Sequence, residues 1–325
     1  MEGGKNVQLF EAEWANYFEV KHAISVNSWT SGLVAMIGAI GISPGDEVIV
    51  PPWTMCATAT AVIIWGGIPI FADIEPDLFC LDPESVRKNI TSKTKAILTV
   101  DIFGQSSDIS TLKKIADEND LFLLSDTAQA PGSKVGGKFT GTLSDIGGFS
   151  LNYHKHIHTG EGGVLVTNND ELALKLKLIR NHGEASVEET GLDDITNIIG
   201  GNYRLGEIEA AIGRIQLKKL NACLDLRQEI VSVLCDGLGG LIGLQLPLIR
   251  DKCTHVFYTF PIILDPIALG VNRDKIVEAL LAEGVKGIEG GYANLHLLPM
   301  FQNKIAMGSK GFPWSYSESR KSVDY

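Results

Sequence analysis

The sequence predicts an α/β protein whose central sheet is mainly parallel and flanked by helices. Short apolar segments typical of buried strands alternate with helical segments through residues 1–226. Residues 48–50, 57–65 and 68–74 have the patterns of a strand, a helix and a strand, and so short a unit favours a parallel pair of strands. Such a sheet buries its apolar strands when helices cover both faces.

The pattern changes beyond residue 226. It turns to a helix, then to an apolar segment at residues 254–264 that we expect to be a strand, a helix over residues 273–283 and another apolar segment at residues 285–288. This order is typical of a small α+β unit. We therefore expect a large domain over residues 1–226 and a small C-terminal domain over residues 227–325.

The other elements of the large domain follow from apolar spacing and capping residues. A helix ends near Tyr17, and another begins after Asn27 and Ser28, which are good helix caps. A late helix carries Ile208 and Ile212 on one side with further apolar residues, and we expect that side to lie in the core. Expected strands are residues 23–26, 95–101, 121–124, 147–151 and 163–167, and expected helices lie within residues 30–40, 77–90, 109–119, 171–181 and 207–220.

Composition excludes several classes of protein. The net charge of −11 disfavours nucleic-acid binding, because no extended basic face would neutralise phosphates. Five scattered cysteines without C-x-x-C spacing predict neither a disulfide framework nor a zinc site. No signal segment is visible at the N-terminus, and the most apolar stretch, residues 57–72, is too short to span a bilayer. We expect a cytoplasmic protein without a nucleic-acid or membrane partner.

Polar residues follow two of the predicted elements. The helix that starts near Thr30 presents free backbone N–H groups, to which Thr30 and Ser31 add hydroxyls, and such a start binds phosphate readily. Asp126 stands at the carboxyl end of the apolar strand 121–124, where open α/β sheets bind ligands. From the residues alone, Asp126 is equally suited to cap the next helix.

Lys155 is our candidate for the centre of the chemistry. It lies in F-S-L-N-Y-H-K-H-I-H-T-G-E-G-G, residues 149–163, on a tight connection between two predicted strands, whereas most lysines are solvated surface charges. A lysine attacks an aldehyde or ketone when its surroundings lower its pKa. His154, His156 and His158 alternate around it, but no cysteine or carboxylate set accompanies them, so we predict no metal site.

The segment around Lys155 resembles the DegT/DnrJ/EryC1/StrS family of sugar aminotransferases, which are fold-type-I enzymes that use pyridoxal phosphate (PLP). The family pattern is roughly F-S-F-x-x-x-K-x-x-x-T-G-E-G-G, and Phe149, Ser150, Lys155 and residues 159–163 fall in register with it. The resemblance implies that Lys155 carries PLP as a Schiff base and that Ser150 donates to the PLP phosphate.

Other motifs extend the resemblance along the chain. The family pattern D-x-A-Q-A is matched from Asp126, which implies that Asp126 keeps the pyridine nitrogen protonated and that Gln129 contacts the cofactor near its hydroxyl, or the substrate. Thr30 and Ser31 lie where the family segment N-S-G-T-x-A-L holds the phosphate. Met55 lies where relatives often place an aromatic residue over the ring. Its alternative role is that of a core filler, with Trp53 as the candidate to cover the ring instead.

The resemblance also covers residues outside these motifs. Trp29 stands where a glycine is usual. The G-x-N-Y-R pattern is similar to a segment that crosses a dimer interface, which implies that Asn202 binds the phosphate in the neighbouring subunit's site and that Arg204 supports this loop or contacts substrate. A homodimer with composite active sites follows. His296 resembles a residue near the sugar-binding mouth and is a candidate for substrate contact.

The resemblance implies an aminotransferase that moves an amino group from an amino acid, with glutamate as the donor, to a nucleotide-linked keto-deoxysugar, for amino-sugar or surface-polysaccharide biosynthesis. One alternative is a PLP-dependent sugar dehydratase on the same scaffold. Dehydratase relatives replace the lysine, commonly by histidine, so Lys155 argues against that reaction. The other alternative is a non-catalytic cofactor-binding or regulatory member. Relatives usually extend beyond both ends of this sequence, so we expect the small domain to be incomplete.

Overall fold

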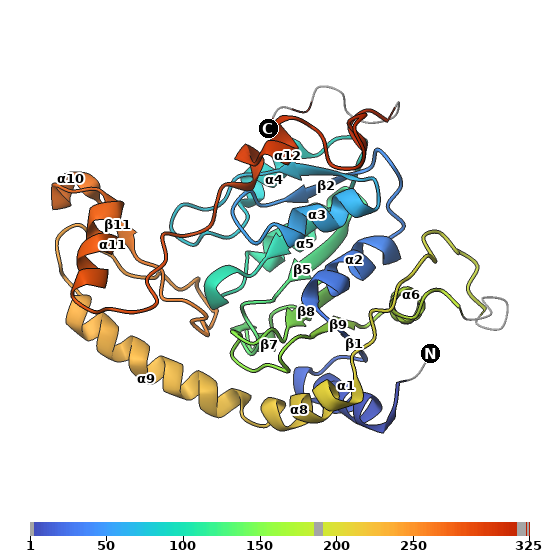
Figure 1. Cartoon of the computed structure of the whole chain (residues 1–325), viewed down its shortest axis with the longest axis horizontal. Coiled ribbons are helices and arrows are strands. Elements are labelled where there is room, and N and C mark those ends of the chain that lie inside the picture. The colour runs from blue at the N-terminus through green and yellow to red at the C-terminus, as the bar shows by residue number, and fades with distance from the viewer. Residues whose placement is uncertain (1–2, 185–190, 317–322, 324) are drawn as a thin grey trace.

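The protein is built on a seven-stranded sheet with helices on both faces (Figure 1). The structure is a computed structural model that describes residues 3–184, 191–316, 323 and 325. The strand order is β1-β9-β8-β5-β4-β2-β3. The strands are β1 (His22–Val26), β2 (Glu47–Val50), β3 (Ile68–Phe71), β4 (Thr94–Val100), β5 (Phe122–Asp126), β8 (Ile146–Ser150) and β9 (Gly163–Thr167).

Most neighbouring strands in the sheet run parallel. β2 pairs in parallel with β3 and β4, and the parallel order continues through β5 to β8. β9 runs antiparallel to both of its neighbours, β1 and β8. All residues of β8 and β9 are buried, as expected for strands covered on both faces. The prediction of a mainly parallel α/β sheet is confirmed.

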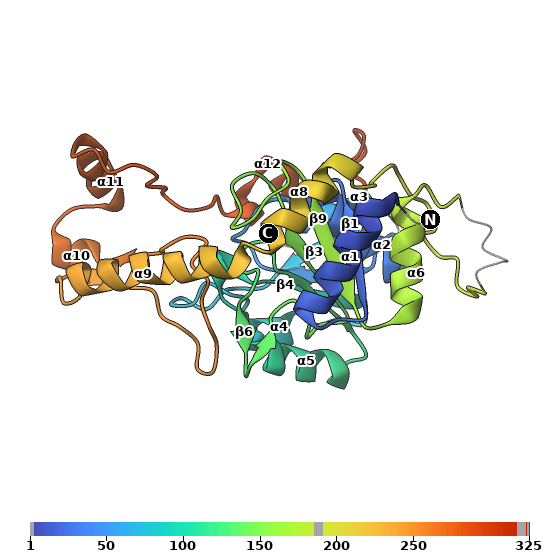
Figure 2. The same ribbon diagram turned by 90° about the horizontal axis from the view of Figure 1, so that it is seen from below.

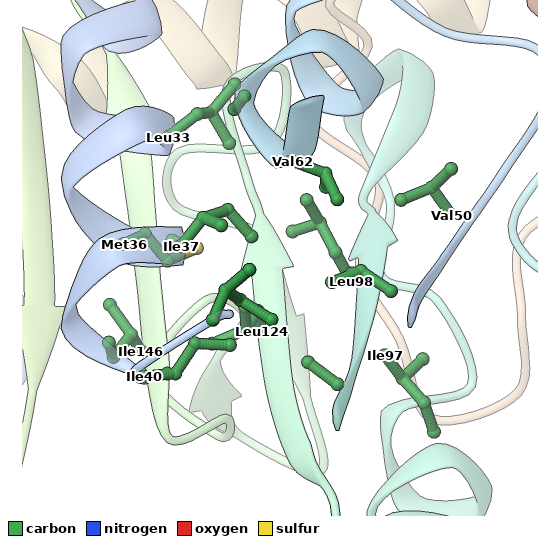
Figure 3. Close-up of a cluster of buried hydrophobic side chains, with 14 of the residues drawn as sticks. Leu33, Met36, Ile37, Ile40, Val50, Val62, Ile97, Leu98, Leu124 and Ile146 are labelled. Atoms are coloured by element: carbon green, nitrogen blue, oxygen red, sulfur yellow. The ribbon is translucent and has the colours of Figure 1, made fainter. Parts of the chain in front are cut away.

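Helices on one face pack their apolar side chains onto alternate strand residues. α2 (Trp29–Ala39) packs against α3 (Ala57–Ile64) and α6 (Asp170–Arg180). Figure 3 shows α2 side chains facing the sheet beside Leu98, Leu124 and Ile146. The labelled residues on this side are Leu33, Met36 and Ile37 of α2 and Ile40, which follows the helix as its C-cap, and their spacing puts them on one side. These side chains belong to the larger hydrophobic core, which also includes buried residues of α5 (Ile109–Glu118).

The opposite face is covered by α1 (Lys5–Phe18) and α8 (Glu207–Leu217) near β1, β8 and β9. α4 (Pro83–Asn89) packs on α5 (Ile109–Glu118), which contacts β4 and β5. Phe149 of β8 lies 5.5 Å from Trp14 of α1, ring centroid to ring centroid. Phe149 and its neighbour Gly148 therefore face opposite sides of the sheet, which puts Gly148 on the α2 side.

The prediction that the isoleucines of α8 lie in the core is wrong. Ile208, Ile212 and Ile215 are 75%, 42% and 53% exposed. α8 instead packs its small residues on α1: a Cβ at Gly213 would lie 2.9 Å from a ring carbon of Phe10. The close helix contact uses Gly213, so the isoleucine stripe faces outward.

The chain beyond α8 forms an arm that leads away from the sheet (Figures 1 and 2). The arm consists of the long helix α9 (Leu220–Leu238), with α10 (Pro266–Leu269), α11 (Arg273–Ala282) and the strand pair β10 (Leu244–Gln245) and β11 (Ile263–Leu264) toward its far end. The expected strand at residues 254–264 forms only at β11. The first part of this segment instead forms hydrogen bonds with loops of the large domain region. Val256 N–H, for example, donates to Gly104 O at 2.7 Å.

No strand forms at residues 285–288, because Gly284 and Gly287 adopt φ values of +87° and +75°, which interrupt an extended chain. The chain then returns to the sheet through η2 (Leu295–Leu297) and α12 (Pro299–Gln302), where Phe301 packs on Phe71 of β3. Short elements near the carboxyl edge are η1 (Ile102–Gly104) and the hairpin of β6 (Lys134–Val135) and β7 (Lys138–Phe139). Within the described residues, no helix combines the length and the apolar character that crossing a membrane requires.

Candidate active site

Asp126 is a buried carboxylate at the carboxyl end of β5, with only 4% of its surface exposed. Its Oδ1 accepts hydrogen bonds from Trp29 Nε1 at 2.7 Å and Ala128 N at 3.2 Å, and its Oδ2 accepts one from Thr58 Oγ1 at 2.9 Å. Burial raises the pKa of Asp126, whereas these donors and the positive charge of Lys155 favour the ionised carboxylate. The site therefore holds an oriented acid at the sheet edge where ligands bind in such folds.

Lys155 lies on the connection between β8 and β9, where its backbone N–H donates to Asn152 O at 2.9 Å. Its Nζ lies 4.3 Å from the centroid of the Tyr258 ring. Burial lowers the pKa of Lys155 to about 8, and the opposite charge of Asp126 limits the drop. About one amine in ten is then neutral at pH 7, far more than for a solvated lysine.

Hydroxyl and N–H donors gather at the start of α2. Ser28 caps this helix by accepting a hydrogen bond from Ser31 N at 3.1 Å. The backbone N–H groups of Trp29 and Thr30 have no acceptor among the described residues, and the Thr30 side chain is exposed. Ser31 Oγ donates to Asn27 Oδ1 at 2.8 Å. Free N–H groups at a helix start suit an anion.

Ser150 ends β8 at the same sheet edge. It pairs with Gly163 of β9, and Gly163 in turn pairs with Val26 at the end of β1, just before α2. The Ser150 hydroxyl accepts a hydrogen bond from Asn152 N at 3.3 Å. The structure thus brings Thr30, Ser31 and Ser150 to neighbouring strand ends.

Gln129 and Met55 differ in their surroundings. Gln129 is buried; its Oε1 accepts from Phe103 N at 2.7 Å, and its Nε2 donates to Tyr292 Oη at 2.8 Å. Met55 precedes α3 and is 62% exposed. Gln129 is therefore held at the site by a contact to the returning C-terminal segment, while Met55 is open to solvent.

Asn202 and Arg204 lie on an exposed loop before α8. The backbone oxygen of Asn202 accepts from Asn27 Nδ2 at 3.0 Å, but its side chain forms no hydrogen bond with the described residues. Arg204 Nη1 donates to Asn181 Oδ1 at 2.6 Å. The His296 ring packs on Phe71, 6.3 Å between centroids, so it lies at the end of β3.

The histidines beside Lys155 differ in burial, and His156 is the buried one of the three. His156 is buried, its Nε2 lies 3.0 Å from Val256 O, and burial lowers its pKa to about 3. In the part of the chain that the structure describes, no three His, Cys, Asp or Glu side chains are grouped as metal ligands.

Three residues near the site carry contacts that the sequence did not indicate. Trp29 and Thr58 donate to Asp126, and Tyr258 places its ring against Lys155. Thr58 lies three residues after Met55, which was expected over the cofactor ring, so its position was a usable signal. Tyr258 comes from a distant segment with no motif, and only the fold brings it here.

The residues present fit three groups of PLP: its ring nitrogen, its aldehyde and its phosphate. A buried carboxylate suits a protonated ring nitrogen, an amine with a lowered pKa suits an aldehyde, and free N–H groups with hydroxyls suit a phosphate. These groups are Asp126, Lys155 and the set of Thr30, Ser31 and Ser150.

Comparison with known proteins gives consistent matches over nearly the whole chain. The sequence matches the DegT/DnrJ/EryC1/StrS aminotransferase family over residues 1–323. GDP-perosamine synthase of Vibrio cholerae is 33% identical over 321 residues, 99% of this chain and 85% of that protein. dTDP-3-amino-3,4,6-trideoxy-alpha-D-glucose transaminase of Streptomyces venezuelae is 34% identical over 301 residues, 92% and 76% of the two chains. The crystal structure of S. venezuelae DesV in complex with a ketimine intermediate has a TM-score of 0.85 at 33% identity, and covers 94% of this chain and 80% of that chain.

The fold and the site together define a PLP-dependent enzyme of fold type I, and its chemistry is that of an aminotransferase. The chain belongs to the DegT/DnrJ/EryC1/StrS aminotransferase family. The family resemblance, the fold class and the cofactor predicted from the sequence are thereby confirmed.

Proposed function

We propose that this enzyme transfers the amino group of an amino acid, with glutamate as the first donor to test, to a nucleotide-linked keto-deoxysugar. The substrate class rests on relatives whose names specify GDP-perosamine and a dTDP-linked amino sugar. The observation that carries the proposal is the pairing of a lysine of lowered pKa with the buried carboxylate of Asp126 at the ligand-binding edge of the sheet. The product would serve amino-sugar or surface-polysaccharide biosynthesis.

Each residue of the site has a proposed task. PLP, when bound, supplies an aldehyde for the amino group and a ring that accepts electrons from the substrate. Lys155 would hold that aldehyde, and as a free amine its Nζ would move a proton to and from the Cα of the amino donor. Asp126 would hold the proton on the ring nitrogen. Thr30, Ser31 and Ser150 would bind the phosphate.

Other residues would complete the pocket. Gln129 would contact the cofactor near its hydroxyl, or the substrate, because its amide is already fixed at the site. Met55 would cover the ring, for which its exposed thioether is available. Arg204 and His296 are our candidates for contacts with the substrate.

The working unit that we propose is a homodimer. Asn202 has a side chain without a hydrogen-bond partner among the described residues, which suits a contact with the phosphate in a neighbouring subunit's site. The isoleucine stripe of α8, residues 208, 212 and 215, lies close by in sequence and offers apolar surface for the second copy. We also propose the cytoplasm as its compartment, because all five cysteines are free thiols.

The test uses purified protein loaded with PLP, glutamate and a panel of nucleotide-linked keto sugars, with products identified by mass. We expect one keto sugar to gain an amino group while glutamate becomes its keto acid. Lys155→Ala should abolish both changes. A sugar product that has lost one hydroxyl oxygen and gained no nitrogen, with ammonia released as the donor is consumed, would identify a dehydratase. No product and no visible absorption with PLP would favour the non-catalytic alternative.

A further inference from the structure

Trp29, at the first turn of α2, contacts the residue that we assign to the cofactor ring. We infer that Trp29 is a positioning residue: its indole N–H holds the Asp126 carboxylate in the orientation and the ionised form that the PLP ring nitrogen requires. The inference rests on the proposed role of Asp126 and goes beyond it, because it assigns a second residue that acts through that carboxylate.

The geometry around Asp126 supports a directed interaction. The indole Nε1 lies 2.7 Å from Asp126 Oδ1, the shortest of the three hydrogen bonds that this carboxylate accepts. Trp29 and Asp126 are 7% and 4% exposed, so water does not screen the contact. Thr58 donates to the other oxygen, Oδ2. Donors on both oxygens fix the rotation of the carboxylate plane.

The other tryptophans of the chain show that this choice of acceptor is unusual. Trp53 and Trp65 donate to backbone carbonyls, and Trp314 donates to a tyrosine hydroxyl. Trp14 Nε1 is buried without a partner among the described residues. Trp29 is thus the tryptophan whose N–H donates to a charged group.

Glycines leave the space that the indole occupies. A Cβ at Gly148 of β8 would lie 2.2 Å from Trp29 Cη2, and one at Gly32 would lie 2.7 Å from Trp29 Cε3. Neither distance is compatible with a side chain. The sheet and the helix are therefore both shaped around this indole, which extends from the start of α2 to the end of β5.

A charge-assisted hydrogen bond of this kind stabilises the carboxylate relative to the carboxylic acid. Removal of the indole N–H shifts Asp126 toward its neutral form and leaves only the longer bond from Ala128 N, at 3.2 Å, on Oδ1. The carboxylate is then held less firmly, so its pairing with a protonated ring nitrogen weakens. The strength typical of hydrogen bonds to charged groups corresponds to about a ten- to hundredfold change in an equilibrium constant.

The test is the affinity of the apo protein for PLP and for pyridoxamine phosphate, measured by calorimetry on the full chain. We expect Trp29→Phe to raise both dissociation constants about ten- to hundredfold. Thr58→Val removes the donor to Oδ2 and should act in the same direction. The matched control is Trp65→Phe, because Trp65 also donates its indole N–H and also packs over a glycine, Gly38, away from Asp126. It should change the affinity by less than about twofold.

A PLP analogue with C–H in place of the ring nitrogen separates positioning from packing. The difference between Trp29→Phe and wild type should nearly vanish with this analogue, as it should in the Asp126→Asn background. A difference of equal size with the analogue, or none with PLP itself, would overturn the inference while leaving the proposed function intact. If Trp29→Phe fails to fold by circular dichroism, Thr58→Val decides in the same way. If wild type binds no PLP, both proposals fail together.

Discussion

At the scale of single residues, the decisive feature is the balance of effects on the Lys155 amine. Burial favours its neutral form, while the carboxylate of Asp126 favours the ammonium form, and the net result is a pKa of about 8. The Tyr258 ring also stabilises the ammonium form through its negative face. The amine is thus poised close to physiological pH, which suits a group that must accept and return protons.

This balance predicts how Lys155 reacts with a small amine-directed reagent in the apo protein. Its labelling rate should rise with pH through a midpoint near pH 8 and level off about two pH units higher, where nearly all of the amine is neutral. Ordinary lysines, with a pKa of about 10.4, should continue to gain reactivity. Peptide mass spectrometry after pulses of reagent at successive pH values gives the profiles. Asp126→Asn should move the Lys155 midpoint to lower pH, since it removes the attractive charge. A Lys155 profile that follows the ordinary lysines would contradict the assignment.

At the scale of elements, the ends of β4 and β5 place two buried carboxylates side by side. Asp101 follows β4 and is fully buried; its oxygens accept hydrogen bonds from Ser107 N, Thr127 Oγ1 and Thr140 Oγ1. Burial raises its pKa from 3.8 to about 6, and the charge of Asp126 acts in the same direction. Asp101 connects the loop after β4 to the segment that follows β5.

Asp101→Asn should therefore stabilise the apo protein more at neutral than at acidic pH. A carboxyl whose pKa is raised by folding contributes stability below its ordinary value, and this contribution is lost as the pH rises through about 6. Asparagine carries no charge to desolvate, and the threonine hydroxyls can turn to accept from its amide. The gain at about pH 7 over about pH 4 should be on the order of 2–3 kcal/mol. Thermal unfolding at both pH values measures it.

Asp117→Asn is the control for this measurement, since Asp117 lies on the exposed side of α5 with 61% of its side chain accessible. Its effect should stay below about 0.5 kcal/mol at both pH values. If Asp101→Asn changed the stability equally at both pH values, burial would not be raising the pKa of Asp101.

The elements that sequence could predict are those with local signals. Buried strands form continuous apolar segments, so β4, β5, β8 and β9 were predictable. The positions of Asp126 at the end of β5 and of Lys155 on the connection between β8 and β9 followed. The structure of the segment 254–264 was not predictable, because its backbone forms hydrogen bonds with a loop that is distant in sequence. The contacts of Trp29 with Asp126 and of Tyr258 with Lys155 were not predictable for the same reason, since the two residues of each pair are far apart in the sequence. Amphipathic spacing also could not say which side of α8 meets α1.

At the scale of the whole molecule, the site draws on both parts of the chain. Tyr258 and Tyr292 come from beyond residue 226 and contact Lys155 and Gln129 respectively. The chain leaves the sheet with α9, comes back to it near Val256, leaves again for β11 and α11, and returns through η2 (Figure 2). The division into domains at residue 227 stays a prediction, and these contacts mean that movement between the two parts would alter the site.

The proposed dimer would add a third source of residues. Asn202 and the outward isoleucines of α8 are separated by only a few residues, so one surface would provide both apolar contact and a polar group that reaches across. Interfaces between identical subunits commonly combine such an apolar centre with polar neighbours. If Asn202 serves the other subunit, each site depends on two chains.

A composite site predicts complementation between two inactive variants. Lys155→Ala lacks the amine, and Asn202→Ala lacks the proposed phosphate contact, so each homodimer should be impaired at both of its sites. In a mixed dimer, one site combines Lys155 of one subunit with Asn202 of the other, and is complete. Co-expression with two different tags and sequential purification isolates this mixed dimer, which should regain up to about half of the wild-type rate, one site of two.

The α8 stripe gives this experiment its control. Ile208→Glu in both subunits should prevent recovery, because it puts a charge into the apolar contact, whereas Ile267→Glu on α10, at a residue that is 92% exposed, should not. Mixed dimers that stay as inactive as their parents would show that Asn202 serves its own subunit. Recovery that survives Ile208→Glu would place the subunit contact on another face. Only recovery that requires an uncharged α8 stripe supports a site shared between two chains through this surface.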